Sequence, residues 1–187
     1  MSKQVQEAYI VAAARTPVGK APRGVFRNVR PDDLLAHALR AAMGQVPSLE
    51  HGAVDDVVVG CAIPEAEQGM NVARIGLLLA GFPNTVGGVT VNRFCSSGLN
   101  AVAIAADRIR LGEADVVIGA GTESMSMIPM GGNKISANER IFLDDENVGI
   151  AYGMGITAEK VAQQWKVPRE AQDEFATESH RRALAAA

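Results

Sequence analysis

One stretch limits the possible folds of this chain more than any other. Residues 99–111 read Leu-Asn-Ala-Val-Ala-Ile-Ala-Ala-Asp-Arg-Ile-Arg-Leu, with almost no polar side chain in the first two turns of the helix that they predict. A helix that is apolar on all sides is buried on all sides. Its small residues would let other elements approach the axis closely: Ala101, Ala103, Ala105 and Ala106. Because one sheet covers only one side of a helix, we expect a second covering layer, from later sequence or from a partner chain.

Short apolar runs around this helix predict a mainly parallel sheet. Four of them read as strands: residues 9–13, 56–63, 87–92 and 115–121. They are near-continuous rather than alternating, as expected for strands that are covered on both faces. Helical patterns lie between them, so the sequence predicts β-α-β units and an α/β fold.

The first helix is marked at both ends. Pro31 suits the first helical position, Asp32 and Asp33 complement the positive end of the helix dipole, and Gly44 can end the helix. A shorter helix is expected over about residues 71–79.

The sequence changes character after Gly121. Polar residues, methionines and a glycine pair predict a long segment with little regular structure, up to about Gly155. Two helices should follow, at about residues 157–165 and from Pro168 onward. The final three alanines contain no Gly, Asn or Pro to end the last helix, so we expect the natural chain to continue.

Composition excludes several classes of protein. The formal net charge is −3 and the charges of both signs are interspersed, which gives no support to nucleic-acid binding. No apolar run approaches the roughly 20 residues of a membrane span, and the first seven residues contain no apolar leader. The two cysteines form neither a Cys-x-x-Cys pair nor a cluster with histidines, which argues against zinc and against a disulfide framework. We expect a cytoplasmic protein with free thiols and no bound metal.

Cys95 is the residue whose position best suits chemistry. It follows a predicted strand and precedes the apolar helix, where free backbone N–H groups and the helix dipole would stabilise a thiolate. Ser96 and Ser97 can satisfy donors of the first helical turn, and Gly98 allows another segment to approach. The alternative is a cysteine used only for packing, since free Cys is among the most buried residue types. Packing is the interpretation that we give to Cys61, which lies within an apolar strand.

Several short blocks of this sequence resemble those of the thiolases, a family that transfers acyl groups to and from coenzyme A. The most specific block is Asn-Arg-Phe-Cys-Ser-Ser-Gly at residues 92–98. Other blocks agree in order and spacing: residues 9–19, 69–74, 121–126 and 154–159. The resemblance extends over the whole chain but corresponds to the N-terminal half of a thiolase only.

The resemblance implies a chemical role for Cys95. In thiolases the matching cysteine attacks the 3-keto carbon of a 3-ketoacyl-CoA, acetyl-CoA is released, and free CoA then removes the shortened acyl group from the cysteine. This is covalent, ping-pong catalysis. The reverse reaction is a Claisen condensation. Coenzyme A and acyl-CoA are thus the implied ligands, as substrates, with no separate cofactor.

Three catalytic groups of the family have no counterpart in this sequence. Thiolases use the His of a Gly-His-Pro motif, the Cys of a Cys-x-Gly motif and the Asn of an Asn-Glu-Ala motif, all in the C-terminal half. None of His37, His51 and His180 precedes a proline, and we interpret all three as structural or solvated. We therefore expect this half alone to be inactive.

The resemblance also implies an architecture. Thiolases pack two similar core halves in five layers, α-β-α-β-α, with the nucleophile helix near the centre, which agrees with the apolar helix at residues 99–111. Residues 1–121 should form the N-terminal βαβαβ core half, and residues 122–187 the beginning of an inserted loop domain. Since thiolases are dimers or tetramers, we expect a homodimer or homotetramer, or pairing with a chain that carries the second half.

Met154 relates to the choice of substrate, because the matching thiolase residue lines the acyl pocket. Short-chain biosynthetic members usually carry a His just before it, whereas this chain has Gly153. Together with the loop at residues 129–134, this favours the degradative 3-ketoacyl-CoA thiolases of fatty acid β-oxidation. The alternatives are a short-chain acetoacetyl-CoA thiolase, a β-ketoacyl synthase of the same architecture, and a non-catalytic thiolase-like subunit.

Overall fold

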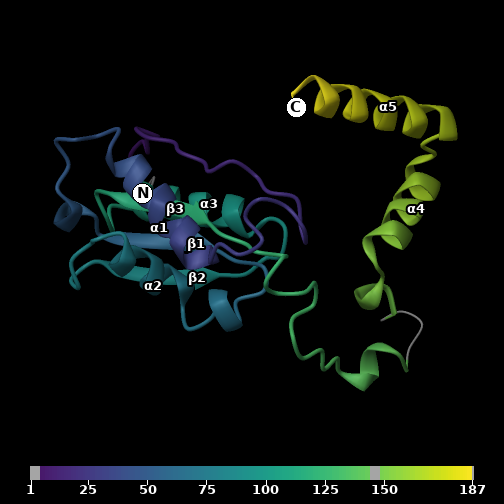
Figure 1. Ribbon diagram of the computed structural model, residues 1–187, viewed down its shortest axis with the longest axis horizontal. Helices are drawn as coiled ribbons and strands as arrows, with labels where there is room; N and C mark the ends of the chain where they lie inside the picture. Colours follow the sequence, from purple (N-terminus) through teal and green to yellow (C-terminus); the bar gives the residue numbers. More distant parts are fainter. Residues whose placement is uncertain (1–4, 144–147, 187) are drawn as a thin grey trace. The chain divides into compact units, whose positions relative to one another are not determined.

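The computed structural model describes residues 5–143 and 148–186 of the 187-residue chain (Figure 1). The chain divides into two compact units, Met1–Ile135 and Ser136–Ala187. The expectations that rest on the first four residues and on Ala187 lie outside the described residues. The predicted boundary between the core half and the loop domain, at residue 121, is based on the thiolase architecture and stays a prediction.

The first unit is built on a parallel sheet of three strands, β1 (Asp56–Gly60), β2 (Gly87–Val91) and β3 (Val117–Gly121). The strand order is β2-β1-β3, and Asp56 is in register with Gly87 on one side and Val117 on the other. Helices α2 (Val72–Leu79) and α3 (Ser97–Arg110) make the crossovers. The predicted α/β fold and the βαβαβ order are confirmed, with strands somewhat shorter than the apolar runs.

Helices cover both faces of the sheet. The step from β1 to β2 and the step from β2 to β3 run in opposite directions across the sheet. Because parallel crossovers are right-handed, this reversal places α2 and α3 on opposite faces. The alternation of residues along β1 agrees with this. Val57 and Val59 belong to the core that α2 helps to form, whereas Gly60, on the other face, meets α3.

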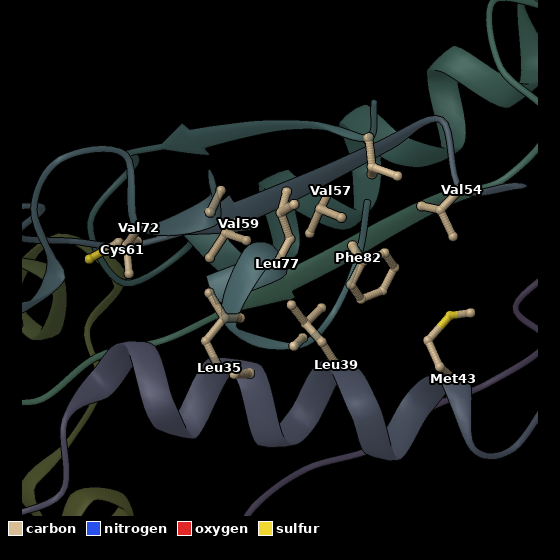
Figure 2. Packing of buried hydrophobic residues seen from close by; sticks show 14 residues of the cluster. Leu35, Leu39, Met43, Val54, Val57, Val59, Cys61, Val72, Leu77 and Phe82 are labelled. Atoms are coloured by element: carbon tan, nitrogen blue, oxygen red, sulfur yellow. The ribbon is translucent and has the colours of Figure 1, made fainter. Parts of the chain in front are cut away.

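Helix α1 (Pro31–Met43) packs beside α2 and closes the main core (Figure 2). Its residues Leu35, Leu39 and Met43 recur every four positions and point from one side of the helix toward the sheet. Leu35 and Leu39 are fully buried, and each such leucine contributes about 2 kcal/mol relative to an exposed one. The helix begins at Pro31 and ends just before Gly44, as predicted.

On the other face, α3 approaches the sheet over glycines. A Cβ atom at Gly60 would lie 2.6 Å from the carbonyl oxygen of Ser97, and one at Gly119 would lie 2.8 Å from the Cα atom of Val102. The helix buries Ala101 and Ala105 on this side, but Leu99, on its other side, is 76% exposed. The predicted burial on all sides is therefore not found within the described part of the chain, because no described element covers the far side of α3.

The predicted strand at residues 9–13 is wrong. This segment is extended, but it joins no strand ladder and belongs to no helix (Figure 1). Ala13 exchanges hydrogen bonds with the side chain of Gln45, at 3.2 and 2.8 Å, instead of with a strand. Tyr9 and Ile10 are 78% and 81% exposed. An apolar run becomes a central strand only where both of its faces are covered, and here that cover is absent among the described residues.

Short 3₁₀ turns complete the first unit, η1 (His51–Ala53) and η2 (Ala66–Gln68). The second unit begins with two more, η3 (Glu139–Ile141) and η4 (Val148–Ala151). The predicted irregular segment is thus confirmed where the structure describes it.

Two helices end the second unit, α4 (Met154–Trp165) and α5 (Arg169–Ala185). Both were predicted, but α4 begins at Met154 rather than at Thr157. None of the described residues of either helix is buried. Large apolar side chains such as Trp165 and Phe175 therefore remain exposed.

Candidate active site

Cys95 lies in the short turn that connects β2 to α3, and its side chain is exposed. The turn is at the carboxyl edge of the sheet, where the neighbouring strands β1 and β2 lead into helices on opposite faces. Ligands of open α/β folds bind at such an edge, outside the carboxyl ends of the strands. The position of Cys95 therefore suits a residue that meets a ligand.

The residue before the cysteine has an unusual backbone conformation. Phe94 has a φ of +46°, in the left-handed region that residues with a Cβ atom rarely adopt. Its N–H donates to the Oδ1 atom of Asn92 at 2.8 Å. The Nδ2 atom of the same Asn92 side chain donates to the carbonyl oxygen of Ala62, just beyond β1, at 2.9 Å. One amide side chain thus connects the turn of the cysteine to the neighbouring strand.

The two serines stabilise the turn rather than the helix. The hydroxyl of Ser97 accepts from the N–H of Arg93 at 2.8 Å and donates to the carbonyl oxygen of Phe94 at 2.6 Å. The hydroxyl of Ser96 donates to the carbonyl oxygen of Arg93 at 2.9 Å, and Ser96 makes no side-chain capping bond. The prediction that these serines satisfy first-turn donors is wrong, because both hydroxyls bond to loop groups that precede the helix.

As a result, several N–H groups at the start of α3 stay free. Among the residues that the structure describes, no acceptor is found for the N–H groups of Cys95, Gly98 and Leu99, whereas Asn100 donates to the carbonyl oxygen of Ser96 at 2.9 Å. Free N–H groups at the positive end of a helix stabilise an anion, or an oxygen that gains negative charge during a reaction. The turn therefore offers a thiol and hydrogen-bond donors at the same place.

Gly98 was expected to allow close approach of another segment. A Cβ atom at this position would meet nothing within 4 Å. The space on the Cβ side of Gly98 is therefore open within the described part of the chain. The strands approach its backbone from the other side, where a Cβ atom at Gly121 would lie 3.6 Å from the Cα atom of Gly98.

Cys61 is the other thiol, and its surroundings are the opposite. It is 1% exposed, and its N–H donates to the carbonyl oxygen of Val91 at 3.0 Å. Burial, together with the negative charge of Glu123, raises the pKa of the Cys61 thiol to about 12. A thiol with so high a pKa is protonated near neutral pH and is a poor nucleophile. These observations agree with the interpretation of Cys61 as a packing residue.

A polar cluster next to the turn has no counterpart among the sequence-based predictions. The carboxylate of Glu123 accepts from the N–H of Ala62 at 2.6 Å and also from the side-chain amide of Gln68. The fully buried Gln68 in turn accepts from the N–H of Ser124 at 2.9 Å. These bonds fix the residues beyond β1 against the residues beyond β3. The resemblance to thiolases includes the block at residues 121–126, but it does not indicate this role of Glu123.

The remaining candidate residues lie elsewhere. Met154 is the first residue of α4 in the second unit and is 71% exposed, and its predicted role in substrate binding stays a prediction. His51 stacks edge-on against Phe82, with ring centroids 4.8 Å apart, and His37 and His180 are exposed. These positions agree with structural or solvated histidines.

Neither a metal-binding cluster nor a membrane-spanning helix is found within residues 5–143 and 148–186. No group of three His, Cys, Asp or Glu side chains there is arranged to hold a metal ion. Every helix in that part of the chain is too short or too polar to cross a membrane.

Comparison with known proteins agrees with this fold. The family described as "Thiolase, N-terminal domain" matches residues 8–187. The chain therefore belongs to the thiolase family, and it corresponds to the N-terminal half of a thiolase.

Individual relatives lead to the same conclusion. The chain is 48% identical over 182 residues to a 3-ketoacyl-CoA thiolase of Bacillus subtilis (strain 168), a match that covers 97% of this chain and 46% of that protein. It is 42% identical over 183 residues to the 3-ketoacyl-CoA thiolase FadA of Escherichia coli (strain K12), again over 97% of this chain and 46% of the relative. A 3-ketoacyl-CoA thiolase of Shigella boydii serotype 4 matches with the same identity and coverage. The chain thus spans about half the length of the curated relatives that it matches.

Proposed function

We propose that this chain is part of an acyltransferase that cleaves 3-ketoacyl-CoA with free CoA, and that Cys95 carries the acyl group between the two steps. The observation that supports this most directly is the exposed thiol of Cys95 beside N–H groups that have no acceptor among the described residues, in a member of the thiolase family. The relatives named above are 3-ketoacyl-CoA thiolases, which favours the same reaction here.

In the first step the Cys95 thiolate attacks the 3-keto carbon of the substrate. The bond between C2 and C3 breaks, its electron pair remains on C2, and C2 takes up a proton as acetyl-CoA leaves. In the second step the CoA thiol gives up its proton and attacks the acyl-cysteine, and the Cys95 thiolate departs. The free N–H of Cys95 is suited to donate to the thioester oxygen as that oxygen becomes negative.

Further groups are needed to activate the thiol and to move these protons. We assign them to a C-terminal thiolase half, in the same polypeptide or in a partner chain, because the family's Gly-His-Pro and Cys-x-Gly motifs are absent from this sequence. The same second half would cover the open side of α3, where Leu99 is exposed. A homodimer or homotetramer is the assembly that family membership favours.

Degradative 3-ketoacyl-CoA substrates are favoured over acetoacetyl-CoA. The sequence has Gly153 before Met154, where short-chain members of the family usually have a His. In this proposal Met154 lines the acyl pocket, and its exposure within the second unit leaves it available for that role.

The test is a thiolysis assay on natively purified protein, with all of its associated chains. The protein is mixed with CoA and 3-ketoacyl-CoA substrates of several chain lengths, and the acyl-CoA products are identified by mass spectrometry. Acetyl-CoA plus an acyl-CoA two carbons shorter is expected, with Cys95→Ala inactive and Cys61→Ala active. Turnover of acetoacetyl-CoA alone would indicate the short-chain alternative. No turnover of any substrate by a complete assembly would favour a non-catalytic subunit.

A further inference from the structure

We propose that Asn92 is a positioning residue for the acyl-accepting cysteine. Its side-chain amide holds Phe94 in the left-handed conformation, and thereby sets where the Cys95 thiol and the N–H groups beside it lie. The inference rests on the proposed function, because positioning matters only if Cys95 accepts an acyl group.

The turn needs such support because its conformation is unfavourable by itself. With a φ of +46°, Phe94 is in a region that disfavours any residue with a Cβ atom, by roughly tenfold in population. The side chain of Phe94 is 72% exposed, so packing does not hold it there. Its N–H is held by the 2.8 Å hydrogen bond to Asn92, and its carbonyl oxygen by the Ser97 hydroxyl at 2.6 Å. An Asn that accepts a bond from the backbone two residues later is a recognised way to stabilise a tight turn.

The Asn92 side chain is itself anchored. Its Nδ2 atom donates to the carbonyl oxygen of Ala62 at 2.9 Å, and the N–H of Ala62 donates to Glu123 at 2.6 Å. Since Ala62 is held on both sides, the amide cannot turn away without losing a bond. The hydroxyl of Ser97, by contrast, ties the turn only to the start of α3. Asn92 is thus the side chain that fixes the turn relative to β1.

Loss of this brace should affect acylation more than simple thiol reactivity. Acyl transfer needs the sulfur and an N–H donor around one carbonyl carbon and its oxygen, so an angular error is costly. Alkylation by iodoacetamide needs only an accessible thiolate. A general structural defect would not slow acylation selectively over alkylation. It would also expose the buried thiol of Cys61.

Asn71 provides a matched control in the same unit. Its own backbone is left-handed, with a φ of +58°, as that of Phe94 is and that of Asn92 is not, and its side chain also makes two bonds. It donates to the carbonyl oxygen of Gly88 at 2.9 Å and accepts from the hydroxyl of Thr90 at 2.8 Å. Replacing Asn71 with alanine removes the same chemical group and a similar pair of bonds, but none that reaches the turn of Cys95.

The experiment compares Asn92→Ala, Asn71→Ala and the unaltered protein in its native assembly. Acylation of Cys95 by acetoacetyl-CoA and alkylation by iodoacetamide are followed by peptide mass spectrometry, together with labelling of Cys61. Asn92→Ala should slow acylation about tenfold and change alkylation by less than roughly twofold, while Cys61 stays unlabelled. Asn71→Ala should leave acylation unchanged.

Three results would overturn the proposal: normal acylation of Asn92→Ala, an equal loss in Asn71→Ala, or a loss accompanied by labelling of Cys61. If the unaltered protein takes up no acyl group, it is the proposed function that fails. Amide hydrogen exchange then decides the role of Asn92 by itself. The N–H of Phe94 must lose its protection in Asn92→Ala while that of Asn100 keeps it, and retained protection at Phe94 would refute the brace.

Discussion

The contact between α3 and the sheet leads to a graded prediction for three glycine-to-alanine variants. All three glycines lie on the face of the sheet that carries α3, and none has a positive φ, so an added Cβ atom acts only through the space that it needs. At Gly60 that atom would lie 2.6 Å from the carbonyl oxygen of Ser97, and closer still to the Ser97 carbonyl carbon. At Gly119 the nearest atom would be 2.8 Å away, and at Gly121 it would be 3.4 Å away.

These distances set the size of each effect. In Gly60→Ala the start of α3 must move by about 1 Å, because the Ser97 backbone has no rotamer that would remove the clash. A gap of that size weakens each dispersion contact between α3 and the sheet by a quarter to a half. Overpacking of this kind costs about 1–3 kcal/mol, so we expect about 3 kcal/mol for Gly60→Ala and about 1–2 kcal/mol for Gly119→Ala. Gly121→Ala makes an ordinary contact and gains some chain stiffness, so its effect should stay below about 0.5 kcal/mol.

The assay uses Cys61 as a reporter of the first unit. In a Cys95→Ser background, Cys61 is the remaining thiol, and being 1% exposed it reacts with a short pulse of reagent only after this unit unfolds. With a urea dependence of about 2 kcal/mol/M, 3 kcal/mol lowers the midpoint by about 1.5 M. Fluorescence of Trp165, the only tryptophan, reports the second unit and should not change. Equal midpoints for Gly60→Ala and Gly121→Ala would refute the packing argument.

Three further predictions concern the stability of the first unit. The pKa of Cys61 is about 12 in the folded protein and ordinarily 9.0, so the unfolded chain loses this proton at a lower pH than the folded one. The free energy of unfolding should therefore fall by at most about 4 kcal/mol between pH 9 and 12. Urea titrations should show a smaller decline in Cys61→Ala. Hydrogen bonds from the N–H groups of Val116 and Asp115 hold the pKa of Asp55 below its usual value, so the protein loses stability as the pH falls. In the same titrations, the free energy of unfolding of Asp55→Asn should fall less between pH 7 and pH 3 than that of the unaltered protein. Gln68→Leu leaves the buried N–H of Ser124 without its partner and should cost about 2–3 kcal/mol by thermal unfolding, and an unchanged Tm would contradict the role given to this amide.

Local signals in the sequence predicted much of the first unit. Pro31 and Gly44 marked the ends of α1, and the alternation of apolar runs with helical patterns predicted parallel strands with crossovers. The position of Cys95 at a strand-to-helix turn followed from the same pattern. These features depend on residues that are close together in the sequence, and for that reason the sequence predicts them.

Other features depend on what covers a segment in three dimensions. The apolar residues at 9–13 look like a buried strand, yet nothing in the described chain covers Tyr9 or Ile10. The apolar character of α3 predicted burial on all sides, whereas Leu99 is exposed and no described element covers it, so the second layer stays a prediction. Periodicity shows that a side chain needs cover, and it does not show which element provides that cover.

The details of the candidate site were the least predictable. Ser96 and Ser97 were expected to cap α3, but the directions of their hydroxyls depend on loop carbonyls that the sequence does not locate. The role of Asn92 had a partial signal, since Asn side chains commonly bond to the backbone two residues later in turns, but the sequence does not show that Phe94 is left-handed. No comparable signal pointed to the link between Glu123 and Ala62, whose partners are far apart in the chain.

The measurement that tests the central claim most directly is the mass of the natively purified protein before and after acetyl-CoA or acetoacetyl-CoA is added. We predict one added acyl group per polypeptide that contains these residues, located on Cys95 by peptide mapping, retained in Cys61→Ala and absent in Cys95→Ser. The mass before addition also shows whether the natural polypeptide is longer, or is accompanied by a second chain. A complete assembly that takes up no acyl group, or one that takes it up on a residue other than Cys95, would contradict this account.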